Sequence, residues 1–428
     1  MEKKRIPKRR FREFLEAGEW EETVFNDTFD TNVGNNTLSR EQLDYNEGSI
    51  RNIHYGDVLI NFPSVVDIEY EEIPRIMCEY EKHISKSQLL KNGDIVMADT
   101  AEDDTVGKAI EIEGIKDDYV VAGLHTIVCR PKHKVAQNYF GYAVNAPAYH
   151  KQLIPLMQGT KVTSINKSAL GETIIRKSLE IEEQAKIGDF CRRLDALISL
   201  HQQKLSKLKD LKQAYLTEMF PAPGEKRPRR RFKGFSGDWE EVRLGDIGRC
   251  QSGIGFPDDE QGGRIGVPFY KVSDMNNIGN ERIMTNANNY VTFEQIKNNA
   301  WHPIADVPAV IFAKVGAAVL LNRKRMVYQP FLIDNNTMAY KLGDRWNDEF
   351  CKSLFDTLNL PSLVQVGALP SYNAIDVENM QVYLPVFEKE QAKIGNFFHR
   401  FDTLIFFHRQ RVSKLQSLKQ AYLSELFV

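Results

Sequence analysis

Few residues of this chain have the types and spacing that catalysis requires. Gly253 and Gly255 form a Gly-x-Gly pair, but a dinucleotide-binding loop needs a third glycine between a strand and a helix. The segment Asn61-Phe-Pro-Ser64 resembles the Asn-Pro-Pro-aromatic motif of adenine methyltransferases, yet it lacks the second proline. The sequence contains no G-x-x-x-x-G-K-[ST], G-x-S-x-G or H-E-x-x-H motif. These absences favour a binding or scaffolding subunit over an enzyme, with no metal or cofactor bound by this chain.

Two histidines, His201 and His408, occupy equivalent places in a long internal repeat. A metal-binding or catalytic role would need further Cys, His or Asp residues at ligand spacing beside them. Neither histidine has such a neighbour in the sequence, so we expect both to be polar residues in a helix seam.

The composition indicates a globular protein of two or more domains. Of the 428 residues, 42% are hydrophobic and 27% are charged, and the net charge is −2. Nucleic-acid binding would therefore depend on local basic patches. The five cysteines are scattered, which fits a reducing cytosol better than a disulfide framework. The sequence begins without a signal peptide, and its most apolar run, residues 307–321, is too short to span a bilayer, so we expect a cytoplasmic protein.

The strongest pattern is an internal repeat. Residues 183–220 and 390–427 align without gaps at a shift of 207 positions (390 − 183). A shorter repeat precedes each of them, because residues 7–22 and 228–241 share a proline, a basic run, two phenylalanines and Trp-Glu-Glu. A repeat of this length indicates a duplicated module, and we expect the two halves to be related by a pseudo-twofold axis.

The long repeat has the pattern of a long α-helix. It contains no proline, and apolar residues recur at heptad positions a and d, with a polar pair in the middle of each copy. We expect the two helices to pack as an antiparallel coiled coil, with the polar layer near their crossing point. The predicted seam residues are Ile187, Phe190, Leu194, Leu197, Leu208, Leu211, Tyr215, Ile394, Phe397, Phe401, Leu404, Leu415, Leu418 and Tyr422.

Between the repeats the two halves look unrelated in sequence. Short β-rich runs alternate with turn residues, and strands are expected over 57–60, 94–97 and 307–312. This mixture predicts an α+β protein with two mixed α/β domains. The predicted organisation is a repeated opening over 1–22, a variable domain over 23–180, a long helix over 181–222, a linker with the second opening over 223–241, a second variable domain over 242–386 and a distal helix over 387–428.

Basic residues cluster at the start of each half. Two interpretations are open: a solvated linker, or contacts to phosphates that position a protein on DNA without specifying sequence. The clustered residues are Lys3, Lys4, Arg5, Lys8, Arg9 and Arg10 in the first half, and Lys226, Arg227, Arg229, Arg230, Arg231 and Lys233 in the second.

Taken together, these features resemble the specificity subunit of type I restriction-modification systems. The most specific marks are Glu-Gln-Ala-Lys-Ile-Gly at 183–188 and 390–395, and Lys-Gln-Ala-Tyr-Leu at 212–216 and 419–423. The opening that ends in Trp239 is also similar. The resemblance covers the organisation of the whole chain.

This resemblance implies a subunit that is not catalytic by itself, in the cytoplasm of a bacterium or archaeon. The variable domains would be target-recognition domains, each reading one half of a bipartite, asymmetric site in double-stranded DNA. The paired helices would set the unread spacer and dock two methyltransferase subunits. Those partners would bind S-adenosylmethionine and flip out an adenine, and a restriction/translocase subunit would join the full complex.

Under this resemblance, some polar side chains would read base edges in the major groove. A Ser-x-Asn echo recurs at the 207-residue shift, at equivalent places close to the long helices. The candidates for DNA contact are Lys161, Thr163, Ser164, Asn166, Ser371, Tyr372 and Asn373. The alternative is that the repeated Ser and Asn residues cap the next helix or turn.

A function of another class also fits the repeated helices. The chain could be a coiled-coil adaptor that binds only proteins and has no sequence-specific DNA binding. Footprinting with a cognate methyltransferase separates the two functions, because an adaptor gives no sequence-dependent protection.

Overall fold

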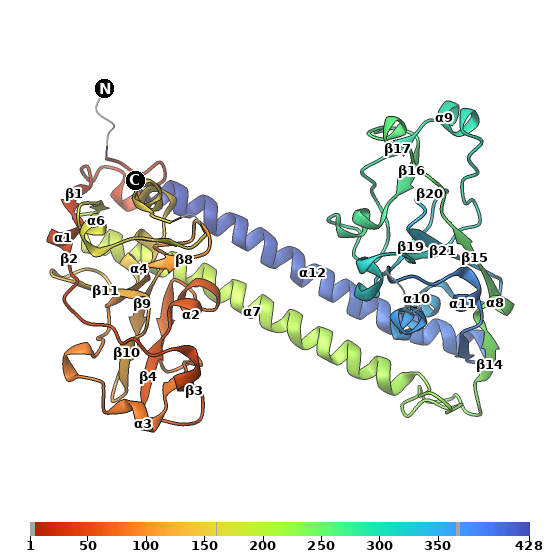
Figure 1. The fold of residues 1–428 in the computed structure, drawn as a ribbon, viewed down its shortest axis with the longest axis horizontal. Helices are drawn as coiled ribbons and strands as arrows, with labels where there is room; N and C mark the ends of the chain where they lie inside the picture. Colours follow the sequence, from red (N-terminus) through yellow and green to blue (C-terminus); the bar gives the residue numbers. More distant parts are fainter. Residues whose placement is uncertain (1–4, 160, 365–368) are drawn as a thin grey trace. The chain divides into compact units, whose positions relative to one another are not determined.

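The computed structural model describes residues 5–159, 161–364 and 369–428. The chain divides into two compact units (Figure 1). The first unit contains Met1–His201 and Arg411–Val428, and the second contains Gln202–Gln410. Each unit therefore combines one variable domain with one end of each of two long helices. Among the described residues, no helix is both long and apolar enough to cross a membrane.

The first unit is built on two main sheets. The four-stranded sheet has the order β10 (Tyr119–Ala122), β4 (Ile50–Ile53), β6 (Arg75–Ile76) and β3 (Leu43–Asp44). The five-stranded sheet has the order β2 (Phe29–Asp30), β11 (Thr126–Pro131), β7 (Ile95–Ala98), β9 (Ala109–Glu113) and β5 (Val65–Asp67). Two further pairs are β1 (Glu21–Val24) with β13 (Ile174–Lys177), and β8 (Thr100–Ala101) with β12 (Thr163–Ser164). Both main sheets are mixed, because β10–β4 and β5–β9 are parallel.

Short helices surround these sheets. They are α1 (Phe25–Thr28), α2 (Tyr55–Ile60), α3 (Cys78–Glu81), α4 (Tyr139–Ala143), α5 (Pro147–Leu153) and α6 (Lys167–Gly171), with 3-10 turns at Arg12–Phe14, Arg40–Gln42, Lys86–Gln88 and Ile154–Leu156. Strands β7 and β9 are buried along their whole length. The core continues from β7 and β9 through Trp20 and Tyr139 to the long helices.

The second unit has a different sheet arrangement. Its four-stranded sheet is antiparallel, in the order β15 (Gly248–Ser252), β21 (Thr337–Leu342), β18 (Ala309–Ala313) and β19 (Lys324–Val327). A three-stranded sheet has the order β17 (Tyr290–Val291), β16 (Val267–Tyr270) and β20 (Leu332–Ile333), and β14 (Glu240–Arg243) pairs with β22 (Gln381–Leu384). The helices are α8 (Leu244–Ile247), α9 (Phe293–Asn298), α10 (Asp348–Thr357) and α11 (Ala374–Glu378), with 3-10 turns at Asp258–Glu260, Val272–Asn276, Ala317–Leu321 and Leu360–Leu363.

Two of the three predicted strands are present. Strand β7 covers residues 95–97 of the predicted strand at 94–97, and β18 covers residues 309–312 of the one at 307–312. The prediction at 57–60 is wrong, because these residues lie in helix α2. The His54 side chain caps α2 by accepting from the Gly56 N–H, while Asp57 and Val58 are buried. Four residues with mixed polarity do not distinguish a strand from a single helical turn.

The long repeats form two helices of 39 residues each, α7 (Ile181–Met219) and α12 (Glu388–Leu426). Within the first unit, the Phe190 ring packs against Tyr422 with centroids 4.8 Å apart, and Lys419 Nζ lies 2.6 Å from an Asp195 oxygen. Numbers rise along one helix as they fall along the other, so the helices are antiparallel.

The second unit repeats these contacts at the 207-residue shift. Tyr215 and Phe397 have ring centroids 5.1 Å apart, and Lys212 Nζ lies 2.7 Å from an Asp402 oxygen. The predicted α+β fold, with two mixed α/β domains and antiparallel long helices, is therefore confirmed.

The predicted seam is buried only in part. Leu197, Leu211, Leu404 and Leu418, all at predicted d positions, are 38–49% exposed. The residues four positions after the predicted a sites are covered instead, including Cys191, Ile198, Met219, Phe398 and Leu426. Each helix end packs on its own variable domain as well as on the other helix, and this turns the buried stripe towards the domain.

The remaining predicted seam residues are either buried or partly buried. Ile187, Leu194 and Ile394 are buried, and the partly buried residues are Phe190, Leu208, Tyr215, Phe397, Phe401, Leu415 and Tyr422.

Candidate partner and nucleic-acid interfaces

The repeated openings are tied to the helices by a buried ion pair in each unit. Arg10 Nε and Nη2 donate to the two Glu183 carboxylate oxygens at 2.5 and 2.7 Å. Arg231 makes the same two bonds to Glu390 at 2.6 and 2.8 Å. Both glutamate side chains are fully buried, so these bidentate bonds compensate charges that water does not reach.

A second pair of arginines reaches the C-terminal end of each helix. Arg9 lies over the Tyr422 ring at 5.2 Å and pairs with Glu425 at 2.5 Å. Arg230 lies over Tyr215 at 5.3 Å and pairs with Glu218. These contacts combine cation–π attraction with an ion pair.

The four arginines therefore join the openings to the long helices, through buried pairs at Arg10 and Arg231 and exposed pairs at Arg9 and Arg230. Neither interpretation of the basic residues, a solvated linker or phosphate contact, included these ion pairs. Lys3 and Lys4, also in the predicted cluster, lie outside the described residues.

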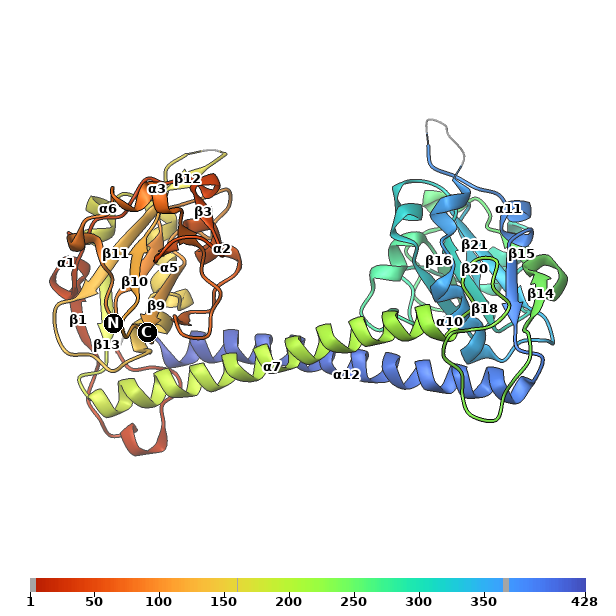
Figure 2. The same ribbon diagram turned by 90° about the horizontal axis from the view of Figure 1, so that it is seen from below.

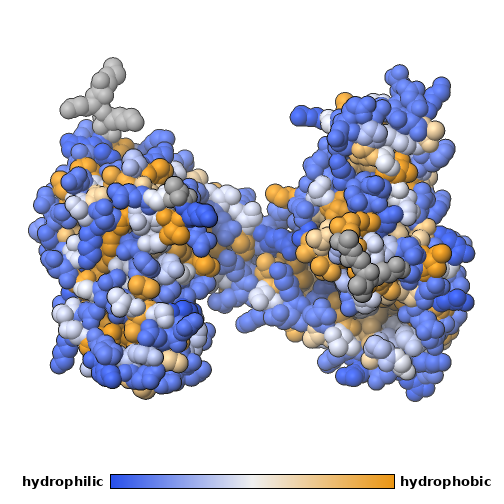
Figure 3. All heavy atoms as spheres, in the orientation of Figure 1, coloured by the Kyte–Doolittle hydropathy of each residue, from blue (hydrophilic) through white to orange (hydrophobic). Residues whose placement is uncertain are grey.

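The helices expose an equivalent set of apolar residues in each unit, which we call the apolar triads. The first triad is Leu197, Leu200 and Leu418, and the second is Leu404, Phe407 and Leu211. Each member corresponds to one in the other triad at the 207-residue shift, and all six are 38–49% exposed. Figure 3 shows hydrophobic residues scattered among polar ones on the face of each unit that it draws. Exposed apolar side chains that recur at equivalent places in both units are candidates for an interaction site.

In the first unit, the candidates for DNA contact lie around a hairpin. Lys161 and Ser164 are exposed. The Thr163 hydroxyl donates to the Asp103 carbonyl at 2.9 Å, and the Asn166 side chain accepts from the Ala169 N–H at 2.8 Å and caps α6. The expected closeness to the long helix is not seen, because Figure 2 shows β12 at the end of this unit opposite α7. Strand β13 runs between them in the chain and spans that distance.

In the second unit, the equivalent candidates are less accessible. The Tyr372 side chain is 5% exposed, and its hydroxyl donates to the Ala313 carbonyl at 2.6 Å. Ser371 is partly buried and forms an isolated β-bridge to Val315. The Asn373 side chain accepts from the Asp376 N–H at 3.0 Å and caps α11. Both asparagines thus have the capping geometry, and DNA contact stays a prediction for all seven residues.

Within residues 5–159, 161–364 and 369–428, no group of three or more His, Cys, Asp or Glu residues is placed to hold a metal ion.

Comparisons with known proteins place the fold. A family model described as "Type I restriction modification DNA specificity domain" matches residues 18–210 and again residues 236–417. The crystal structure of a type I restriction-modification system S subunit from M. genitalium is similar over 99% of both chains, with a TM-score of 0.63 and 15% identity.

A second similar chain comes from a study of complex assembly and conformational transition in the type I R-M system. It covers 95% of this chain and 97% of its own, with a TM-score of 0.52 and 16% identity. A search of curated protein sequences finds no match. At these identities the two structures support the fold alone.

Proposed function

The chain belongs to the type I restriction modification DNA specificity family, and we propose that its two variable domains each read one half of a bipartite, asymmetric DNA site. The chain supplies the sequence specificity and performs no chemistry itself. Sequence is read by side chains that reach base edges, while backbone contacts only position the protein.

One observation supports this proposal. The openings and long helices, which together form a frame, are the same in both halves, whereas the variable domains that the frame holds differ. The helix contacts of Phe190 with Tyr422 and of Phe397 with Tyr215 are equivalent, and so are the ion pairs of Arg10 and Arg231. The main sheets of the two variable domains differ in strand number and pairing. Two dissimilar domains on a duplicated frame suit an asymmetric target with two half-sites.

The apolar triads support docking of two partner proteins, one per unit. Each triad lies within five residues along the helices of an ion pair between them, at Asp195–Lys419 or Lys212–Asp402. Because the triads are equivalent, they fit two copies of one partner. We assign that partner as the methyltransferase subunit, which would bind S-adenosylmethionine and flip the target adenine. A restriction/translocase subunit would join the same complex.

The long helices would set the distance between the half-sites. A helix of 39 residues spans about 58 Å at 1.5 Å per residue. Two half-sites one turn of DNA apart are about 34 Å from centre to centre, which a helix of this length can hold.

Domain exchange tests the proposal. Residues 23–180 are replaced by the corresponding domain of another family member, and methylated motifs are mapped in cells that carry the complete complex. We expect only one half of the methylated motif to change, with the other half and the spacer kept. A change in both halves, or no sequence-dependent methylation, would contradict the proposal, and the second result would favour the protein-only adaptor.

A further inference from the structure

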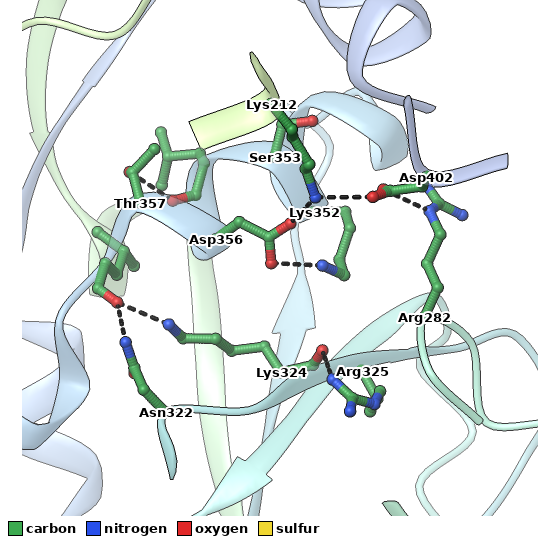
Figure 4. Close-up of polar contacts among 12 residues, drawn as sticks. Lys212, Arg282, Asn322, Lys324, Arg325, Lys352, Ser353, Asp356, Thr357 and Asp402 are labelled. Carbon is green, nitrogen blue, oxygen red and sulfur yellow. Dashed lines mark hydrogen bonds and ion pairs between the residues drawn. The ribbon is translucent and has the colours of Figure 1, made fainter. Parts of the chain in front are cut away.

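The second unit contains a cavity with a cationic lining. It has a volume of about 590 Å³ and is lined by residues of α7, α10, α12 and β19 and of the segment around Arg282. Seven of its lining residues are lysine or arginine, and three are aspartate or glutamate. Figure 4 shows Lys212 and Lys352 directed at Asp356, and Arg282 directed at Asp402. The chain as a whole has a net charge of −2, so this lining is a local excess of positive charge.

Two carboxylates of the cavity, Asp356 and Asp402, each form ion pairs with two cationic side chains. Asp356 accepts from Lys212 at 2.8 Å and from Lys352 at 2.5 Å. Asp402 accepts from Lys212 at 2.7 Å and from Arg282 at 3.1 Å. Burial favours the protonated form of Asp356, but Lys352 and Lys212 outweigh it and hold its pKa well below the usual value. The carboxylate is therefore ionised, and its charge is shared by two ammonium groups.

Two neighbouring cations on β19 have no carboxylate of their own. Lys324 is 3% exposed, and its Nζ donates to the Leu358 carbonyl at 2.6 Å. Among the described residues, no carboxylate forms an ion pair with Lys324 or Arg325. Arg325 Nε and Arg282 Nη1 are buried and have no hydrogen-bond partner in the described part of the chain. Burial lowers the pKa of Lys324 to about 8, which reflects the cost of holding an uncompensated ammonium away from water.

This cationic lining does not belong to the duplicated frame. At the 207-residue shift, the Lys212–Asp402 pair corresponds to Lys419–Asp195 in the first unit. There the carboxylate accepts its second bond from the Tyr142 hydroxyl at 2.8 Å, whereas Asp402 accepts from the Arg282 guanidinium. The frame explains one ion pair in each unit, and the additional cations require another explanation.

We propose that this cavity binds the phosphate group of a small phosphorylated molecule. A phosphate dianion offers several acceptors and would compensate the buried charge of Lys324, while Arg325 and Arg282 add to the positive charge of the same lining. The volume is in the range of small-ligand pockets. Because Lys324 and Lys352 are at most 5% exposed, a terminal phosphate can reach them more readily than the backbone of a broad duplex. The inference stands independently of the proposed reading of DNA.

The experiment uses the full-length chain and pyrophosphate as probe. Calorimetric titration is done with the wild type, Lys324→Met and Arg325→Gln, and with Lys341→Met as the matched control. Lys341 is a lysine of the same unit that pairs with the exposed Asp306 and does not line the cavity. We expect the wild type and Lys341→Met to bind pyrophosphate equally, and both cavity variants to bind at least tenfold more weakly.

Folding is checked by the thermal midpoint without ligand. Lys324→Met should match or exceed the wild type, because it removes a buried charge. Lys324→Gln provides a second variant that keeps a polar group at this depth. Pyrophosphate should raise the midpoint of the wild type more than that of either Lys324 variant.

A second arm uses a short duplex of unrelated sequence. If the duplex alone binds, and Lys324→Met weakens its binding and lowers its salt dependence, the phosphate comes from the DNA backbone and the small-molecule proposal is wrong. If neither pyrophosphate nor duplex binding responds to the cavity variants, the proposal is overturned.

Discussion

The Arg231 guanidinium forms a bidentate ion pair with Glu390, with Nε–Oε1 and Nη2–Oε2 distances of 2.6 and 2.8 Å. Arg231 lies in the repeated opening that precedes the second variable domain, and Glu390 lies in the first turn of α12 after that domain. The pair therefore joins the segment before the variable domain to the segment after it. Arg10 and Glu183 join the equivalent segments around the first variable domain in the same way.

Glu390→Gln should destabilise the second unit strongly. The substitution leaves Arg231 without a compensating charge at a site where the Glu390 side chain is fully buried. Loss of one partner of a buried pair costs about 3–5 kcal/mol. Urea titration should show this decrease in the free energy of unfolding. The control is Arg243→Gln, which breaks an exposed pair with Asp246 and should change stability by less than about 0.5 kcal/mol.

The apolar triads predict how many partners bind. Leu197→Asp should remove one methyltransferase subunit from the complex, and Leu197→Asp with Leu404→Asp should remove both. Neither change should cost much stability, because both leucines are about half exposed. Native mass spectrometry of the assembled complex gives the stoichiometry. The control is Ile198→Ala, which should cost about 2–4 kcal/mol because this residue is buried. Two bound partners in the double variant would contradict the docking role.

The long helices could be predicted from sequence because their signal is long. The proline-free repeats predicted helices over 181–222 and 387–428, and α7 and α12 cover Ile181–Met219 and Glu388–Leu426. The buried face could not be predicted in the same way. Apolar residues occupy two neighbouring stripes, and which stripe is covered depends on the variable domain that packs beside each helix.

Short elements and polar contacts were harder to predict. Residues 57–60 have the composition of a strand, but they lie in helix α2, which His54 caps. Arg10 and Arg231 read as basic surface, because their glutamate partners lie far away in the sequence. The cavity around Lys324 gave no sequence signal, since its cations come from separate segments that only the fold brings together.

Tyr372 gives a direct test of the predicted DNA contacts. Its hydroxyl is buried and donates to the Ala313 carbonyl, so Tyr372→Phe should cost about 1 kcal/mol of stability. The methylated motif should stay the same, as measured by methylation mapping. Lys161→Ala should have the opposite profile, because Lys161 is exposed. It should weaken DNA binding without changing stability. A changed motif for Tyr372→Phe would restore this residue as a base contact.

The buried Glu111 predicts a pH dependence of stability in the first unit. Burial raises the pKa of Glu111 from 4.5 to about 7, although the N–H groups of Gly141 and Asn138 oppose this shift. The folded chain then binds more protons than the unfolded chain between these values. The free energy of unfolding should therefore fall as the pH rises through this window, by up to about 3 kcal/mol.

Urea titrations from pH 4 to 8 measure this effect as the difference between wild type and Glu111→Gln. That difference should change with pH, because the glutamine does not titrate. Glu79→Gln is the control, since Glu79 is exposed, and it should reproduce the wild-type pH dependence. A pH-independent difference for Glu111→Gln would show that Glu111 does not carry the effect.

If the long helices set the distance between the half-sites, their length determines the number of unread base pairs in the spacer. Seven residues are inserted after Lys204 in α7 and at the equivalent place after Arg411 in α12. Two helical turns keep the buried stripe in phase and add about 10 Å at 1.5 Å per residue. The spacer should then grow by about three base pairs at 3.4 Å each, while both half-sites stay the same.

Methylation mapping in cells reads the spacer and the half-sites in one experiment. The matched control inserts the same seven residues after Lys204 alone. That change shifts one helix against the other, so the contacts of Phe190 with Tyr422 and of Tyr215 with Phe397 cannot both form. The single insertion should lower stability and abolish methylation. If the complex with both insertions methylates the original motif with its original spacer, the long helices do not set the spacer length.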